Sequence, residues 1–207
     1  LLAASHRADE AAKMLGEAAT KFPESPELAR ARGDVALQAG NLVEARSQYE
    51  EALNRNPNDL ATRFQLGITL RRMRKFDEAN AVFDKVAEVD PNFPGLALER
   101  GLYFEETGKH AEAIKMYNEA LEKAPNDTDL KLRIGSTQVA AGAAKQAEPL
   151  LKDVVRDRPS SAEANHYLGR AMLLGGGNLN DAIRYLKRAI ELDPNRAEYR
   201  SEERRVG

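Results

Sequence analysis

Small and large apolar residues recur along this chain at intervals typical of helices. In the stretch from Leu60 to Pro91, Ala79 and Val86 flank the large side chain of Phe83 at spacings of four and three. Such spacings place the three side chains on one face of a helix. An earlier Leu66-Gly67 pair belongs to a second helical pattern in the same stretch. The stretch therefore predicts a helix, a tight turn, another helix and an exit turn.

The same pattern returns at a nearly constant period. Prolines mark it at intervals of 34, 34, 34, 34 and 35 residues, at Pro23, Pro57, Pro91, Pro125, Pro159 and Pro194. An alanine stands 12 residues before each of them, at Ala11, Ala45, Ala79, Ala113, Ala147 and Ala182. A large apolar residue stands 8 before each, at Leu15, Tyr49, Phe83, Tyr117, Leu151 and Leu186. This period predicts a tandem array of helix pairs.

Glycines fall at two places in each unit. The middle of each predicted first helix carries one, at Gly33, Gly67, Gly101, Gly135 and Gly169. Because a glycine inside a helix costs about 1 kcal/mol relative to alanine, we expect the backbone of the partner helix to approach closely there. The turn between the helices also contains glycine, where a positive φ can end a helix, except that Arg74 stands there in one unit.

These residues and their spacing resemble the tetratricopeptide repeat, a 34-residue unit with Leu-Gly at positions 7 and 8, Ala at 20, an aromatic residue at 24, Ala at 27 and Pro at 32. The resemblance covers residues 1–199. It implies an all-α fold, an α-solenoid of antiparallel helix pairs in a right-handed superhelix. We expect a partial repeat at 1–25, mainly a second helix, whole repeats at 26–59, 60–93, 94–127, 128–161 and 162–196, and the start of a further repeat at 197–207.

Both ends of the chain differ from a complete repeat array. The start, Leu1 to His6, has no Met and no basic segment followed by an apolar core, so we expect the natural N-terminus to lie upstream. The last eight residues, from Arg200 to Gly207, resemble the translation of a sequencing adapter, and we hypothesise that they are an artefact. Long-read sequencing of the locus tests this hypothesis, which is wrong if the intact gene contains these codons.

Composition excludes some classes of partner and leaves the compartment open. The 31 basic and 33 acidic residues give no net field that would attract nucleic acid or an anionic membrane. No apolar run is long enough to span a bilayer. The absence of cysteine excludes disulfides within the chain but is compatible with any compartment, so cytoplasmic and periplasmic locations both stay open.

No pattern of a catalytic, cofactor or metal site is present. The three histidines, His6, His110 and His166, fall in different units without a second ligand at helical spacing. The Gly175-Gly176-Gly177 run lacks the Lys-Ser/Thr of a phosphate-binding loop, and no strand precedes it. No nucleophile elbow occurs. We therefore expect no enzyme activity, cofactor or metal in this segment.

One basic cluster, Arg71-Arg72 with Arg74 and Lys75, lies near Phe64 and has the composition of a nucleic-acid site. One unit later, the positions equivalent to Arg71-Arg72 are Glu105-Glu106. Because stacked repeats place such positions side by side, we expect the arginines to pair with these carboxylates. This neutralisation disfavours nucleic-acid binding.

The resemblance implies that the first helices line a concave peptide groove. Family positions 5 and 9 are here Arg30, Asp34, Phe64, Ile68, Leu98, Leu102, Leu132, Ser136, His166 and Arg170. The middle of this series is apolar, which favours a groove for a peptide or a helix. The alternative is that these side chains only fill the gaps between neighbouring first helices. Among them, we expect the apolar anchors of a partner to be Phe64, Ile68, Leu98, Leu102 and Leu132.

Family members that clamp the C-terminal carboxylates of chaperones use Lys, Asn and Arg at set positions. The best window here contains Asp34 and Glu99, which repel a carboxylate, so this role is disfavoured. The sequence thus predicts a non-catalytic scaffold that binds a protein or peptide of unknown identity. Two alternatives remain, the substrate-recruiting arm of a larger glycosyltransferase or kinase, and a cell-envelope assembly lipoprotein. The full open reading frame would distinguish them.

Overall fold

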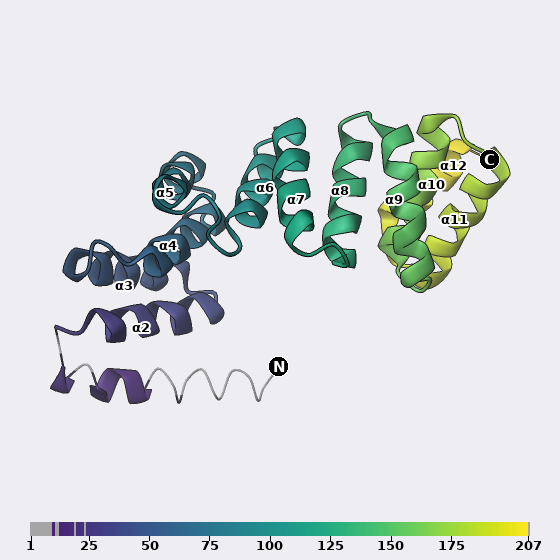
Figure 1. Ribbon diagram of the computed structural model, residues 1–207. Coiled ribbons are helices and arrows are strands. Elements are labelled where there is room, and N and C mark those ends of the chain that lie inside the picture. The colour runs from purple at the N-terminus through teal and green to yellow at the C-terminus, as the bar shows by residue number, and fades with distance from the viewer. Residues whose placement is uncertain (1–9, 11–12, 19, 23, 207) are drawn as a thin grey trace. The chain divides into compact units, whose positions relative to one another are not determined.

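The computed structural model describes residues 10, 13–18, 20–22 and 24–206, and all regular structure in this part of the chain is helical. Its helices follow one another as packed pairs (Figure 1): α2 (Pro26–Gln38), α3 (Leu42–Arg55), α4 (Leu60–Arg72), α5 (Phe76–Val89), α6 (Leu96–Glu106), α7 (His110–Lys123), α8 (Thr128–Ala140), α9 (Ala144–Asp157), α10 (Ala162–Gly175), α11 (Leu179–Leu192) and α12 (Ala197–Val206). The predicted all-α fold is confirmed. Much of the partial repeat expected at 1–25 lies outside the described residues, although 13–18 are helical.

The chain forms two compact units, Leu1–Tyr103 and Phe104–Gly207. In the first unit α2 packs against α3, α3 against α4, and α4 against α5. In the second unit the same order of contacts runs from α7 to α12. Each helix therefore packs mainly against its neighbours in the chain, as expected for a solenoid that has no single central core.

Predicted small and large residues of the second helices form the core of each unit. They are 0–2% exposed, as seen for Ala45, Tyr49, Ala52, Ala79, Phe83, Val86, Ala113, Tyr117, Ala147, Leu151, Val154, Ala182, Leu186 and Ala189. The spacing of four and three turns all of these side chains toward the first helices. The periodic pattern in the sequence is therefore the packing face of the second helices.

The glycines inside the first helices make room for side chains rather than for a backbone. A Cβ atom at Gly67 would lie 2.6 Å from Cε1 of Phe83, and one at Gly33 would lie 2.6 Å from Cε1 of Tyr49. At Gly169 a backbone atom of the partner helix is also among the nearest atoms, the carbonyl oxygen of Ala182 at 3.0 Å. The partner helix does approach closely, and the atoms nearest to Gly33 and Gly67 belong to its ring side chains.

Several helices begin at a side-chain cap, and the turns between paired helices contain residues with positive φ. The side chains of Ser25, Asp59, Asp127 and Ser161 accept hydrogen bonds from backbone N–H groups in the first turns of α2, α4, α8 and α10. Arg74, which replaces a turn glycine, has a φ of 60°. It adopts the left-handed conformation that glycine favours at this position.

We expect Asp127→Ala to lower the free energy of unfolding by about 1 kcal/mol, since its carboxylate accepts from the N–H groups of Asp129 and Leu130 at 2.9 and 3.0 Å. Lys109→Ala is the control, because Lys109 precedes α7 without a side-chain cap. Urea unfolding followed by circular dichroism measures both changes. Equal effects of the two substitutions would contradict the capping role of Asp127.

Candidate functional site

The first helices of the first unit carry a surface that the core does not use. We call it the first-helix face and define it by Arg30, Asp34, Leu37, Gln38, Gln65, Ile68, Arg72, Leu98 and Leu102. All of these side chains are exposed or half-buried. Five of the ten groove residues predicted from the sequence belong to this face: Arg30, Asp34, Ile68, Leu98 and Leu102.

Phe64, one of the predicted anchors, lies in the core instead. It is 8% exposed, and its ring packs against Phe83 and Phe93 with centroid separations of 6.1 and 5.1 Å. Gly95 lies against the same ring, so that a Cβ there would be 3.2 Å from Cζ of Phe64. A charged residue at position 64 would disrupt packing and cannot serve as a test of binding.

The remaining apolar residues of the face are partly accessible. Ile68 packs against the buried cluster that contains Phe64 and Phe83, yet it stays half-buried. Leu98 and Leu102 of α6 are half-buried as well. One helical turn separates Leu98 from Leu102, so both side chains lie on the same side of α6. They leave apolar surface accessible on that side of the helix.

A hollow of about 410 Å³ lies between α2 and α4. It is lined by Asp34, Leu37, Gln38, Gln65 and Arg72. Four of these five side chains are polar, which sets the hollow apart from the apolar residues of α6. The sequence patterns predicted Arg72 only as part of the basic cluster and did not indicate Gln38. Both stand at position 13 of their repeats, which the family resemblance places on the inner surface.

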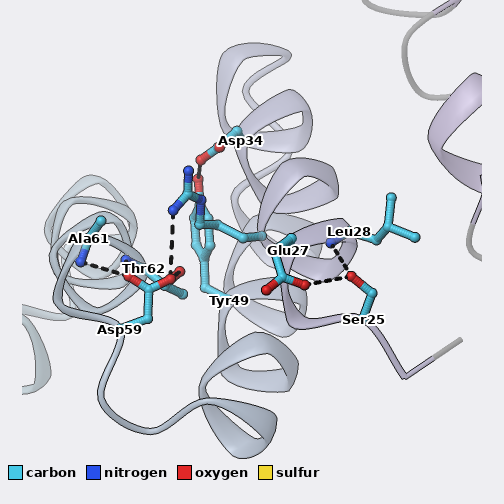
Figure 2. A network of polar contacts seen from close by, with 9 residues as sticks. Ser25, Glu27, Leu28, Asp34, Tyr49, Asp59, Ala61 and Thr62 are labelled. Atoms are coloured by element: carbon cyan, nitrogen blue, oxygen red, sulfur yellow. Dashed lines mark hydrogen bonds and ion pairs between the residues drawn. The ribbon is translucent and has the colours of Figure 1, made fainter. Parts of the chain in front are cut away.

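Asp34 is held in place by a hydrogen bond from the core. The hydroxyl of the buried Tyr49 donates to Oδ1 of Asp34 at 2.7 Å, as Figure 2 shows. Burial, together with the neighbouring carboxylate, raises the pKa of Tyr49 well above its ordinary value. The hydroxyl therefore keeps its proton at neutral pH and continues to donate to Asp34.

Asp59 both caps α4 and binds Arg30, and Figure 2 shows its contacts with Ala61 and Thr62. Its carboxylate accepts from the hydroxyl of Thr62 at 2.6 Å and lies 3.6 Å from the Arg30 guanidinium. Burial raises the pKa of Asp59, but the hydrogen bonds from Thr62 and Ala61 and the charge of Arg30 outweigh it and leave the pKa below its ordinary value. Arg30 is thus engaged with Asp59.

Two of the four members of the basic cluster, Arg71 and Lys75, are paired with acids within the protein. Arg71 is 8% exposed and binds Oε2 of Glu99 at 3.0 Å. Arg72 donates to the carbonyl oxygen of Leu37 at 3.3 Å. Lys75 binds Glu78 at 2.9 Å. The expected pairing of Arg71-Arg72 with Glu105-Glu106 would join the two units and stays a prediction.

Within the second unit, Glu105 occupies a position like that of Asp34 relative to a buried tyrosine. Tyr117 donates its hydroxyl to Glu105, and Arg133 binds the same carboxylate at 2.9 Å. Burial and the Glu105 carboxylate raise the pKa of Tyr117. A tyrosine of the second helix thus holds an acid of the first helix in both units.

Of the four predicted groove residues in the second unit, three are half-buried and one is buried. Leu132 packs against the buried cluster around Leu151 and Leu168 but stays half-buried, as do Ser136 and Arg170. His166 is 1% exposed, and its ring lies 4.5 Å from that of Tyr199 in α12. The expectation that His166 lines an open groove is therefore wrong, because α12 covers it.

A second hollow, of about 510 Å³, runs along α11 and includes Arg184, Lys187 and Arg188 among its lining residues. Arg184 binds Asp181 and Arg188 binds Glu191, each at 3.0 Å. These ion pairs neutralise most of its positive charge. The hollow therefore carries less net positive charge than its arginines alone indicate.

Among the described residues, no group of three or more His, Asp or Glu side chains is placed to hold a metal ion. His110 and His166 lie in different helices, and the third histidine, His6, lies outside the described residues. None of the described helices is long and apolar enough to cross a membrane.

Two sequence models of the tetratricopeptide repeat match the chain, one over residues 1–59 and 64–128 and the other over 105–171 and 138–201. None of the curated proteins compared with the chain matches it.

Solved structures with a similar fold include YrrB, described as a tetratricopeptide repeat protein with an unusual peptide-binding site. It is 18% identical, with a TM-score of 0.77 over 94% of this chain and 100% of that one. MamA is 20% identical, with a TM-score of 0.70 over 86% and 96%. A tetratricopeptide repeat protein from Parabacteroides merdae is 17% identical, with a TM-score of 0.66 over 98% and 78%. At these identities the likeness is one of fold.

Proposed function

Because the chain belongs to the tetratricopeptide repeat family, we propose that it is a non-catalytic scaffold whose first-helix face binds a peptide segment of a partner protein. Repeats of this family and the similar solved structures support a protein-interaction scaffold in general. The observation that carries the narrower proposal is the pair of half-buried leucines, Leu98 and Leu102, in the same unit as the polar hollow between α2 and α4.

Apolar groups left accessible beside polar ones are typical of peptide-binding surfaces. A partner side chain that covers Leu98 and Leu102 gains about 25 cal/mol per Å² of apolar surface removed from water. Hydrogen-bonding groups in the hollow then fix the position of the peptide backbone. Apolar contact and polar orientation together favour a peptide over a small metabolite.

A chaperone-type carboxylate clamp remains disfavoured in this proposal. Asp34 lines the hollow, and Glu99 already binds Arg71 at 3.0 Å. A terminal carboxylate would meet like charge at Asp34 and would compete with Glu99 for Arg71. We therefore expect internal segments of a partner rather than its C-terminus.

We expect Leu98→Gln/Leu102→Gln to weaken peptide binding at least tenfold, which corresponds to about 1.4 kcal/mol of lost apolar contact. Twelve-residue peptides selected from a phage-displayed random library against the unchanged chain serve as probes, with affinities measured by fluorescence anisotropy. Glutamine has a size close to that of leucine, so the change removes apolar contact with little change in volume.

The matched control is Val43→Gln/Val89→Gln, the same type of change at side chains that are 72% and 65% exposed on α3 and α5. Its affinity should stay within about twofold of that of the unchanged chain. Helicity of all variants is compared by circular dichroism. Equal binding by the leucine variant and the control would overturn the proposed use of the first-helix face.

A further inference from the structure

Two charged side chains of the first-helix face are not paired with an opposite charge. Arg30 binds Asp59, and Arg71 binds Glu99. In contrast, no described residue forms an ion pair with Asp34 or with Arg72, although both line the hollow between α2 and α4. The hollow thus presents one negative and one positive group whose charges are not neutralised by an ion pair with a described residue.

Each of these two groups is nevertheless held in position. Asp34 accepts the hydrogen bond of Tyr49 at 2.7 Å with one oxygen, which leaves its other oxygen for a ligand. Arg72 donates to the carbonyl of Leu37 at 3.3 Å, in the last turn of α2. A cation is favoured there because the C-terminal end of a helix carries a partial negative charge. Charged groups held in advance lose little entropy when a ligand binds.

Two primary amides complete the lining. Neither the side chain of Gln38 nor that of Gln65 forms a hydrogen bond with another described residue, and both line the hollow. A glutamine amide offers one acceptor and two donor hydrogens. The same groups are required to satisfy the C=O and N–H of an extended peptide, which has no internal hydrogen bonds of its own.

The points along α2 at which Asp34 and Arg72 are held limit the spacing of charged residues in a peptide ligand. Arg72 donates to the carbonyl of Leu37, which follows Asp34 by three residues, so the two points on α2 at which these groups are held lie about 4.5 Å apart along the helix axis. In an extended peptide, side chains on one face repeat every second residue, about 6.6 Å apart. Adjacent residues point to opposite faces and cannot reach both groups. Flexible long side chains bridge the remaining difference.

We propose that this hollow recognises an extended peptide in which a basic and an acidic residue stand two positions apart, the basic one against Asp34 and the acidic one against Arg72. Gln38 and Gln65 bind the backbone between them. The inference rests on the proposed function of the first-helix face and adds the charge pattern of the partner. A nucleic acid is disfavoured, since its phosphates would meet the fixed carboxylate of Asp34.

The test uses the library-selected peptides and two single variants. Asp34→Asn removes the negative charge but keeps an oxygen that can accept from Tyr49, and Arg72→Gln removes the positive charge. We expect selected peptides to share a basic and an acidic residue two positions apart. Replacing the basic residue of the peptide by glutamine should weaken binding about five- to tenfold to the unchanged chain, but less than about twofold to Asp34→Asn.

Replacing the acidic residue of the peptide by glutamine should likewise weaken binding about five- to tenfold to the unchanged chain, but less than about twofold to Arg72→Gln. Two charge-neutralising changes on α5, Asp77→Asn and Lys85→Gln, are the matched controls, since both side chains are exposed. In these two control variants, each peptide substitution should weaken binding as much as it does in the unchanged chain.

The outcomes separate this inference from the proposed function. One outcome overturns the charge-pattern inference alone. In it, binding of the selected peptides depends on Leu98 and Leu102, but the peptides lack the charge pattern or bind Asp34→Asn and Arg72→Gln as tightly as the unchanged chain. A library that yields no binding peptide, or only peptides insensitive to the leucine changes, overturns both. Peptides with the charge pattern that are sensitive to both sets of variants support both.

Discussion

Glu99→Gln should lower the free energy of unfolding of the first unit by about 3 kcal/mol. Glu99 binds Arg71 at 3.0 Å through both Nε and an Nη atom, and the two side chains are only 15% and 10% exposed. Removing the carboxylate takes an opposite charge away from a nearly buried guanidinium, and water cannot replace that charge at this depth. Urea unfolding followed by circular dichroism and by hydrogen exchange in α4 and α6 measures the loss.

Arg133→Gln is the matched control in the second unit. Arg133 binds Glu105 at 2.9 Å, but its side chain is 42% exposed, so water can solvate Glu105 after the change. We expect a loss of no more than about 1 kcal/mol. A loss for Glu99→Gln as small as that for Arg133→Gln would show that burial of the first pair is not what stabilises it.

These two ion pairs occupy equivalent positions with reversed charge. Each pair joins residues 28 positions apart, Arg71 with Glu99 and Glu105 with Arg133. The base precedes the acid in the first pair and follows it in the second. Deleting one 34-residue unit between them would bring Arg71 to the position that faces Arg133. Because the charges are reversed, the observed order of neighbouring repeats is favoured over an order in which like charges would face each other.

Gly67→Ala should destabilise the first unit by about 2 kcal/mol, although alanine is the better helix former. Its Cβ would lie 2.6 and 2.8 Å from Cε1 and Cδ1 of Phe83, whose ring is fully buried. A rigid ring in a filled core cannot move aside, so the clash exceeds the gain of about 1 kcal/mol in helix propensity. Thermal and urea unfolding of the variant measure the difference.

Gly16→Ala is the control for this substitution. Gly16 lies in a helical segment, and a Cβ there would meet nothing within 4 Å. We expect no loss of stability, and a gain of up to about 1 kcal/mol from helix propensity. If Gly67→Ala stabilised the chain as well, the close approach of Phe83 would not be the reason for glycine at that position.

Much of the fold could be predicted because each repeat carries its own packing pattern. The alternation of small and large residues around Tyr49, Phe83 and Leu151 is enough to identify the buried face of each second helix. Caps such as Asp59 and Asp127 mark helix starts for an equally local reason. Spacing and local hydrogen bonding extend over a few residues, and the sequence shows them directly.

The candidate site was only partly predictable. Position in the repeat placed Ile68, Leu98 and Leu102 on first helices, and the structure leaves all three partly accessible. The same reasoning also selected Phe64 and His166, which the structure buries. A repeat position specifies the direction of a side chain from its helix, but it does not specify what covers that side chain.

The 34-residue period, the helix pairs and the residues that fill each core follow from the amino-acid sequence, because they depend on spacing within one or two helices. Which first-helix residues remain accessible depends instead on tertiary packing. Phe93, from the segment after α5, lies on Phe64, and Tyr199 of α12 lies on His166. Burial depends on atoms that distant parts of the chain contribute, and a periodic pattern cannot encode them.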